Sequence, residues 1–178
     1  MNNSIKRIWN CVTTVLICLL VILVVLLWGF KLLGYEVMVV QSGSMEPNYH
    51  VGALVYVKPV DARQLAVGDV ITFELGGGVR GTHRIVEIVE EGDSRSFVTK
   101  GDNNAEKDSN PVQEQAIVGQ VKFTIPQLGF LVTYIQSPSG TYTAISAAAL
   151  LLLLTVLPDI IFPKGKEDNT QQKEANDQ

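Results

Sequence analysis

The apolar residues divide the chain into two long hydrophobic runs and a mixed segment between them. The first run, residues 11–30, holds twenty residues without a charge. A helix rising 1.5 Å per residue would carry it across the roughly 30 Å of a bilayer core. A cleavable leader has a shorter apolar stretch and then a small-residue cleavage site, which Leu32-Leu33-Gly34-Tyr35 does not offer. We therefore predict an N-terminal segment over residues 1–10 and a retained membrane anchor over residues 11–33.

The second run, residues 142–162, predicts another membrane span. Its core from Ala144 to Leu157 is short for a crossing, but extension to Phe162 makes it long enough. Pro158 and Asp159 would then lie near the interface, where a charge is tolerated. A buried core helix is the alternative interpretation, and length favours the span. The polar residues 163–178 that follow are predicted to be disordered.

Residues 34–141, between the two runs, have the pattern of an all-β barrel or sandwich. Runs rich in Val, Ile, Thr, Phe and Tyr alternate with Gly, Asp, Asn and Pro, and the glycines at 76–78 indicate a hairpin turn. An apolar stretch near the end, Phe130–Ile135, is either a last strand packed in the core or a lip resting on the bilayer surface. The expected strands are Tyr35–Gln41, Ala53–Val57, Val70–Leu75, Thr82–Val89, Ser96–Lys100 and Ile117–Ile125.

The charged residues indicate which partners to exclude and how the chain is oriented in the membrane. The net charge of −4 predicts no nucleic-acid partner, because such proteins present a basic surface. Basic residues flank the runs, with Lys6 and Arg7 before the first and Lys164 and Lys166 after the second. The positive-inside rule then predicts a two-span protein with both termini cytoplasmic and residues 34–141 outside the cell membrane.

The cysteines exclude two kinds of stabilising site in the central segment. Cys11 and Cys18 are the two cysteines of the chain, and both lie in the first apolar run. They have neither a Cys-x-x-Cys nor a Cys/His spacing for zinc, and they cannot form a disulfide within residues 34–141. This spacing predicts no zinc site, and we also expect no other metal and no cofactor.

The candidate chemistry begins with a serine at the end of a strand. Gly43 permits a sharp turn and Pro47 prevents the strand from continuing, which would expose the hydroxyl of Ser44 on a rigid element. A serine hydroxyl needs a base within hydrogen-bond reach, and imidazole accepts a proton near neutral pH. We favour His83 over His50, because a strand fixes a side chain better than a turn does.

Other residues could serve as the base in place of the histidine, or could orient the histidine as a third group. A lysine base, Lys58 or Lys100, would need burial to lower its pKa. A third group should orient the histidine, and the segment from residue 100 to 108 offers Asp102 and Asp108. By composition alone this segment is an ordinary polar loop.

Four sequence segments in order resemble the conserved boxes of type I signal peptidases. They are Ser-Gly-Ser-Met-Glu-Pro from Ser42, Gly-Asp-Val-Ile-Thr-Phe from Gly68, Thr-His-Arg-Ile-Val from Thr82, and Lys-Gly-Asp-Asn-Asn from Lys100 with a further Asp. One box would be weak evidence, but four in order over residues 34–125 are specific. The chain is similar to the ER-type branch, because the housekeeping bacterial branch has a lysine at the position of His83.

The resemblance implies a role for each matched residue. Ser44 would be the nucleophile, His83 the general base, Asp108 the acid completing the triad and Asp102 a second required acid. Ser42 and the backbone N–H of Ser44 would form the oxyanion hole. Which aspartate contacts the histidine is left open by the spacing. The implied fold is a small, mostly antiparallel β catalytic domain between the two transmembrane helices.

The function implied is removal of signal peptides from exported pre-proteins at the outer face of the membrane. The implied partners are signal peptides and the lipid bilayer, with accessory membrane subunits left open. One alternative is a non-enzymatic membrane-anchored β-module that binds peptides or proteins. Another is a metal-dependent hydrolase using His83, Asp102 and Asp108, which is poor in ligands and has no His-Glu-x-x-His helix. A sortase-type thiol enzyme is excluded, because residues 34–141 contain no cysteine.

Overall fold

The computed structural model of the protein describes residues 3–92 and 94–161. These residues form two compact units. Residues 22–141 make up a β unit with short helices, and the described parts of residues 1–21 and 142–178 make up a helical unit. The predicted disordered tail, residues 163–178, lies outside the described residues.

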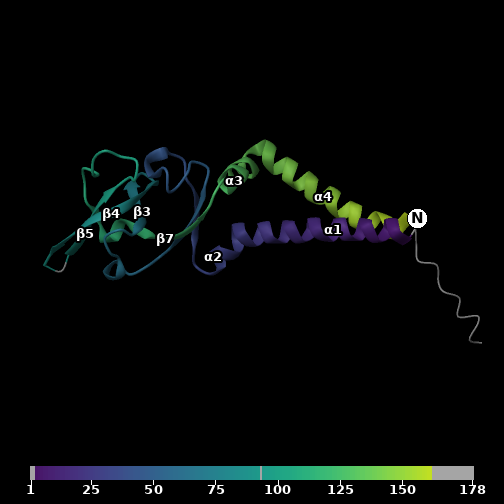
Figure 1. The fold of residues 1–178 in the computed structure, drawn as a ribbon, viewed down its shortest axis with the longest axis horizontal. Helices are drawn as coiled ribbons and strands as arrows, with labels where there is room; N and C mark the ends of the chain where they lie inside the picture. Colours follow the sequence, from purple (N-terminus) through teal and green to yellow (C-terminus); the bar gives the residue numbers. More distant parts are fainter. Residues whose placement is uncertain (1–2, 93, 162–178) are drawn as a thin grey trace, which may run out of the picture. The chain divides into compact units, whose positions relative to one another are not determined.

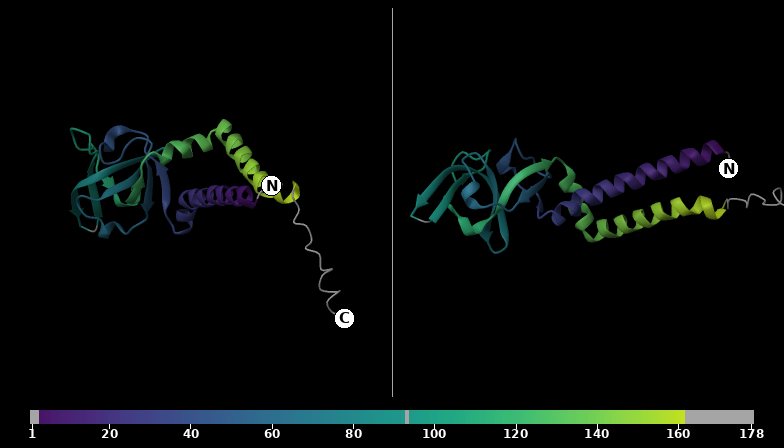
Figure 2. Two further views of the ribbon diagram at one scale, coloured as in Figure 1. Left: turned by 45° about the vertical axis from the view of Figure 1, so that its right-hand side comes forward. Right: turned by 90° about the horizontal axis from the view of Figure 1, so that it is seen from below.

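The β unit is built on a single antiparallel sheet of seven strands in the order β1-β2-β7-β3-β4-β5-β6 (Figure 1). The sheet curls on itself, as the two further views show (Figure 2). The predicted fold class, mostly β and antiparallel between two membrane-spanning helices, is confirmed, with one curled sheet in place of two stacked ones. The strands are β1 Glu36–Val39, β2 Leu54–Lys58, β3 Val70–Gly76, β4 Val79–Glu91, β5 Ser94–Lys100, β6 Val112–Gln113 and β7 Ile117–Ile125.

Three short 3-10 helices lie between the strands: η2 Gly43–Met45, η3 Ala62–Gln64 and η4 Glu114–Ala116. The first of them carries Ser44 and begins four residues after the end of β1. The glycine hairpin predicted at residues 76–78 is present between β3 and β4, and all three glycines have the positive φ that such a turn requires.

Apolar residues on the strands form the core of the β unit. Phe97, Ile71 and Ile85 are completely buried in one cluster with Phe73. A second cluster forms around Tyr56, whose ring stacks on Phe123 with centroids 4.3 Å apart. This cluster also receives the end of the first long helix, because the Tyr56 hydroxyl donates a hydrogen bond of 2.7 Å to the Leu26 carbonyl. The end of the helix, from residue 22 onward, is thereby joined to the sheet.

The first apolar run is helical throughout. It comprises α1 (Asn3–Val24), a π-helical turn η1 (Val25–Gly29) and α2 (Phe30–Leu32). The second run is α4 (Pro138–Ile161), which begins earlier than residue 142 because the fixed φ of proline suits the first helical position. Residues 7–32 and 138–157 are long and apolar enough to cross a bilayer. In the helical unit, the Trp9 indole donates a hydrogen bond of 3.1 Å to the Leu154 carbonyl.

The prediction of a strand at Phe130–Ile135 is wrong. These residues belong to the helix α3 (Leu128–Gln136). Its early turn packs closely on the sheet, because Gly129 donates a 2.9 Å hydrogen bond to the Gly52 carbonyl and a Cβ at Gly129 would lie 2.7 Å from that oxygen. A short apolar run does not distinguish a strand from a helix, and this tertiary contact decides for the helix.

Candidate active site

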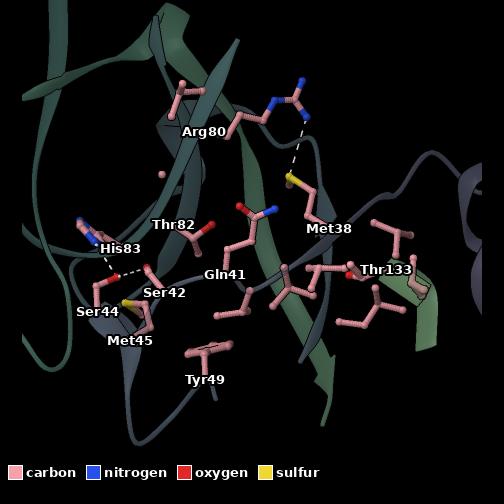
Figure 3. Close-up of a pocket in the computed structure, with 18 of the residues that line it drawn as sticks. Met38, Gln41, Ser42, Ser44, Met45, Tyr49, Arg80, Thr82, His83 and Thr133 are labelled. Carbon is pink, nitrogen blue, oxygen red and sulfur yellow. Dashed lines mark hydrogen bonds between the residues drawn. The ribbon is translucent and has the colours of Figure 1, made fainter. Parts of the chain in front are cut away.

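A chain of three side chains crosses the β unit from η2 to the loop after β5. The Ser44 Oγ lies 3.2 Å from His83 Nε2, and the other ring nitrogen of His83 lies 2.6 Å from Asp108 Oδ2. Figure 3 shows the Ser44–His83 pair at one end of a groove. The imidazole and the carboxylate are largely shielded, with 18% and 25% of their side chains exposed. The structure therefore joins the favoured serine and histidine, and it answers the open question in favour of Asp108 as the neighbour of His83.

Each member of this chain is fixed by its backbone surroundings. Ser44 lies in η2 between the extended Ser42 and the buried Met45, so its hydroxyl emerges at the end of β1. His83 lies in β4 opposite Ile71 of β3. The loop that carries Asp108 is tied to β5, because the Asp108 N–H donates a 2.8 Å hydrogen bond to the Thr99 carbonyl.

Thr99 is a member of the site that the sequence analysis missed. Its hydroxyl is completely buried and donates a 2.6 Å hydrogen bond to Asp108 Oδ2. The same oxygen faces the His83 ring. A threonine in the middle of a predicted strand carries no local signal for this role, because only the register of β4 with β5 brings it beside the histidine.

Asp102 does not contact the histidine; it belongs to a separate network. Arg84 donates from Nε to Asp102 Oδ1 at 2.8 Å and from Nη2 to Asp102 Oδ2 at 2.7 Å. The Asn48 amide donates a further hydrogen bond of 2.8 Å to Oδ2. The hydrogen bonds from Arg84 hold the pKa of Asp102 below its usual value, against the opposing effect of burial. The hydrogen bonds to Asp102 in turn raise the pKa of Arg84. Arg84 follows His83 directly in the third box, which is the one sequence signal that pointed to it.

This network holds a loop against Ser44. Asn103, next to Asp102, donates its backbone N–H to the Ser44 carbonyl at 2.9 Å and its side-chain amide to the Gly43 carbonyl at 3.3 Å. The approach requires glycine at position 101, since a Cβ there would lie 2.6 Å from the Ser44 carbonyl oxygen. The network around Asp102 therefore fixes the loop that contacts Ser44 and Gly43.

The remaining candidates are placed as follows. The Ser42 hydroxyl lies 3.3 Å from the Ser44 hydroxyl, on the groove side (Figure 3). His50 is exposed and pairs with Glu46. The Lys58 ammonium lies over the Tyr35 ring, 5.4 Å from its centre, and Lys100 is the register partner of Arg84. Neither His50 nor the two lysines takes part in the hydrogen-bond chain that starts at Ser44.

The three residues considered as metal ligands, His83, Asp102 and Asp108, are bound to other side chains or to one another. Asp102 is engaged by Arg84 and Asn48, whereas His83 and Asp108 bind each other. Among the described residues no group of three or more His, Cys, Asp or Glu side chains is placed to hold a metal ion. The arrangement that the structure supports is a hydroxyl activated by a histidine, which is the arrangement of nucleophilic catalysis.

A groove of about 900 Å³ leads away from Ser44 and His83. Its walls come from two strand edges that face each other. One is β1, the terminal strand of the sheet, and the other is the beginning of β4, ahead of Arg84, where pairing with β5 starts. Arg80 on β4 bridges to Glu36 on β1 and lies 3.8 Å from the Met38 sulfur. The groove ends beside Trp28 and Lys31 at the end of the first long helix.

Comparison with known proteins finds signal peptidases among the relatives of this chain. Signal peptidase I W of Bacillus subtilis is 48% identical over 88 residues, which cover 49% of this chain and 46% of that protein. The signal peptidase complex catalytic subunit SEC11 of Scheffersomyces stipitis is 30% identical over 130 residues, covering 68% of this chain and 76% of the yeast protein. SEC11C of Homo sapiens is 30% identical over 130 residues, covering 66% and 67%. No protein-family model matches the chain.

Proposed function

The chain belongs to the ER-type signal peptidase family, and from this premise we propose that it is a membrane-bound serine endopeptidase that cleaves signal peptides from pre-proteins. The observation that carries the mechanism is the continuous contact from Ser44 through His83 to Asp108. A module that only binds peptides has no need of such a chain. The enzymatic function is therefore favoured over the binding module.

In the proposed mechanism Ser44 attacks the carbonyl carbon of the scissile peptide bond while His83 Nε2 accepts its proton. Asp108 accepts the hydrogen bond of the opposite ring nitrogen, so that Nε2 is free to act as the base. The imidazolium that forms then protonates the leaving amine. Water, activated by the same nitrogen, hydrolyses the acyl-enzyme and regenerates Ser44.

The oxyanion of the tetrahedral intermediate needs fixed hydrogen-bond donors. The backbone N–H of Ser44 and the hydroxyl of Ser42 are the proposed pair, and the hydroxyl lies 3.3 Å from the nucleophile. Removing one such donor from an acyl-transfer enzyme costs about 3–4 kcal/mol of transition-state stabilisation. Ser42→Ala is expected to raise the activation free energy by a similar amount, and so to lower kcat, while leaving the fold intact.

The two strand edges of the groove define the proposed path of the substrate. Four antiparallel pairings separate β1 from β4, so the two strands run in the same direction, away from the end of the first long helix and toward Ser44 and His83. A signal peptide leaves the bilayer at its apolar segment and reaches its cleavage site afterwards. It would therefore lie extended and parallel to both edges, pairing with their free main-chain groups.

The membrane placement completes the proposal. The chain is a membrane protein with two helices able to span the bilayer. Basic residues before the first and after the second favour cytoplasmic termini and an extracytoplasmic β unit in the cell membrane. Confining enzyme and substrate to one membrane raises their effective concentration. SEC11 and SEC11C are named as subunits of a complex, and purification of this chain from its membrane tests for accessory subunits.

The decisive experiment measures processing of a pre-protein by the purified full chain in lipid vesicles. Ser44→Ala and His83→Ala are each expected to reduce cleavage to background, because the residual enzyme lacks its nucleophile or its base. His50→Ala is the matched control and should cleave like the wild type. Processing by Ser44→Ala with an unchanged melting temperature would refute the mechanism.

A further inference from the structure

Helix α3 exposes an apolar face. None of its nine residues is charged. The exposed fractions are 58% for Phe130, 39% for Leu131 and 50% for Tyr134. Positions 130, 131 and 134 fall on one side at the helical spacing of 3.6 residues per turn. A helix that faced water would carry polar side chains there, so this face is adapted to another environment.

The opposite side of α3 packs on the β unit, and one part of the Phe130 ring also lies against Gly52. Gly129 is buried against the Gly52 carbonyl, and Leu128 and Val132 pack on the cluster around Tyr56. The residues that follow on this side, Thr133 and Gln136, line the groove. The helix is therefore a wall of the groove, and its apolar outer face cannot turn inward to be buried.

The chain itself places α3 at a membrane surface. One residue, Ser137, separates the end of α3 from the start of α4, whose residues 138–157 are able to span a bilayer. Ser137 holds this junction, because its hydroxyl accepts the Gly140 N–H at 3.1 Å. The sequence contains no charged residue from 123 to 158, so no charge separates α3 from the span, although residues 136–141 between their apolar parts are polar.

We propose that α3 lies in the interfacial region of the bilayer, with Phe130, Leu131 and Tyr134 among the lipids. The occupant of this face is the lipid surface, because one residue joins the C-terminal end of α3 to the span and allows it only about 3.6 Å of separation. The nine residues of the helix add no more than about 14 Å at 1.5 Å per residue, so the whole face stays close to the bilayer. Tyrosine is enriched at this depth because its ring is apolar and its hydroxyl is polar, which suits Tyr134. The helix would then separate the groove from the lipid by its own thickness.

This position has a consequence for catalysis that rests on the proposed function. A substrate whose apolar segment lies in the bilayer would reach the groove beside α3 without crossing bulk water. Immersion of α3 would set the height of Ser44 above the membrane. Substrates anchored in the same bilayer should therefore depend on the α3 face more than short soluble peptides do.

The position of α3 can be measured with a nitroxide spin label on the full chain in vesicles of phosphatidylcholine and phosphatidylglycerol. Cys11 and Cys18 are first replaced by serine, and Leu131→Cys or Phe130→Cys is labelled. Val67→Cys is the matched control, because Val67 is apolar and 60% exposed in the turn before β3. Collision with oxygen reports lipid, and collision with a water-soluble nickel chelate reports water.

We expect the labels at 130 and 131 to collide at least several times more often with oxygen relative to the nickel chelate than the label at 67. Equal ratios at the three sites would overturn the proposal, because α3 would then face water. Low collision with both reagents at 130 and 131 would also overturn it, because a second copy of the chain would then cover the face.

A functional comparison separates this inference from the proposed function. Leu131→Glu should reduce cleavage of a pre-protein reconstituted in the same vesicles at least fivefold relative to Val67→Glu, with cleavage of a short soluble peptide unchanged. Equal cleavage by the two variants would contradict the role of the α3 face. Absence of cleavage by the wild type would instead refute the proposed function, and the spin-label ratios would still decide the position of α3.

Discussion

One carboxylate oxygen joins two donors at the centre of the site. Asp108 Oδ2 lies 2.6 Å from both the His83 ring nitrogen and the Thr99 hydroxyl. Two fixed donors on one oxygen leave the carboxylate little freedom to rotate, so the imidazole is held in the plane that points Nε2 at Ser44. Hydrogen bonds to charged groups contribute about 1.5–3 kcal/mol each.

Thr99→Val is therefore expected to lower kcat about tenfold with little change in KM, since substrate contacts are not altered. Thr99→Ser keeps the hydroxyl and should restore most of the activity. Steady-state kinetics of the two variants on one peptide, with melting temperatures measured beside them, test this. Equal kcat for Thr99→Val and the wild type would show that the second donor is dispensable.

Asp102 gives a pH-dependent contribution to stability. Its pKa in the folded protein is lowered, chiefly by Arg84, so its contribution is fully present above the ordinary carboxyl pKa and disappears as the pH falls through the lowered value. Asp102→Asn should reduce the free energy of unfolding by about 1.5–3 kcal/mol at pH 7. The difference from the wild type should shrink progressively below about pH 4.

Thermal unfolding of the two proteins at pH 7 and at the lowest pH where both are soluble measures this difference. Asp61→Asn is a suitable control, because Asp61 accepts a single backbone hydrogen bond from Arg63 and Asn serves equally well there. A gap between wild type and Asp102→Asn that stays constant with pH would contradict the linkage.

The loop between β5 and Asp108 and the turn η2 behave as one element. Asn103 holds both carbonyls of Gly43 and Ser44, and Gly101 lies too close to Ser44 for any side chain. Catalysis depends on contacts of this accuracy, because misplacement by about 1 Å can cost a hundredfold in rate. We propose that Asp102, the second acid of the box, acts by fixing the loop that contacts Ser44.

Gly101→Ala tests this coupling. The new Cβ would lie 2.6 Å from the Ser44 carbonyl oxygen, so η2 or the loop must move. We expect kcat/KM to fall at least tenfold, with a smaller effect on the melting temperature than on activity. Gly43→Ala meets only the flexible Glu46 side chain at 3.6 Å and should disturb the backbone less. An unchanged kcat/KM for Gly101→Ala would show that the loop yields without moving Ser44.

Topology is a property of the two spans together with the charges around them. The basic residues at 6 and 7 and at 164 and 166 predict that both ends of the chain are cytoplasmic. A C-terminal epitope tag should therefore resist protease added outside intact cells, while a tag in the hairpin at residues 76–78 should be cleaved. Removal of the C-terminal tag from intact cells would place that end outside.

The sequence determined those features that depend on local composition and periodicity. Long apolar runs predicted both membrane helices, and segments rich in β-branched and aromatic residues predicted six of the seven strands, with Ile117–Ile125 matched at both ends. The box order also pointed to Ser44, His83 and an aspartate. The two-residue strand β6 was missed because so short a segment has no periodicity to detect.

Tertiary structure decided the features that depend on packing and register. The choice between Asp102 and Asp108 was settled by the pairing of β4 with β5, which puts Thr99 and Asp108 beside His83 while Arg84, the next residue in the strand, faces away and binds Asp102. The helix at 128–136 arose because Gly129 packs against the Gly52 carbonyl. Both outcomes rest on contacts between residues far apart in the chain, which leave no trace in local pattern.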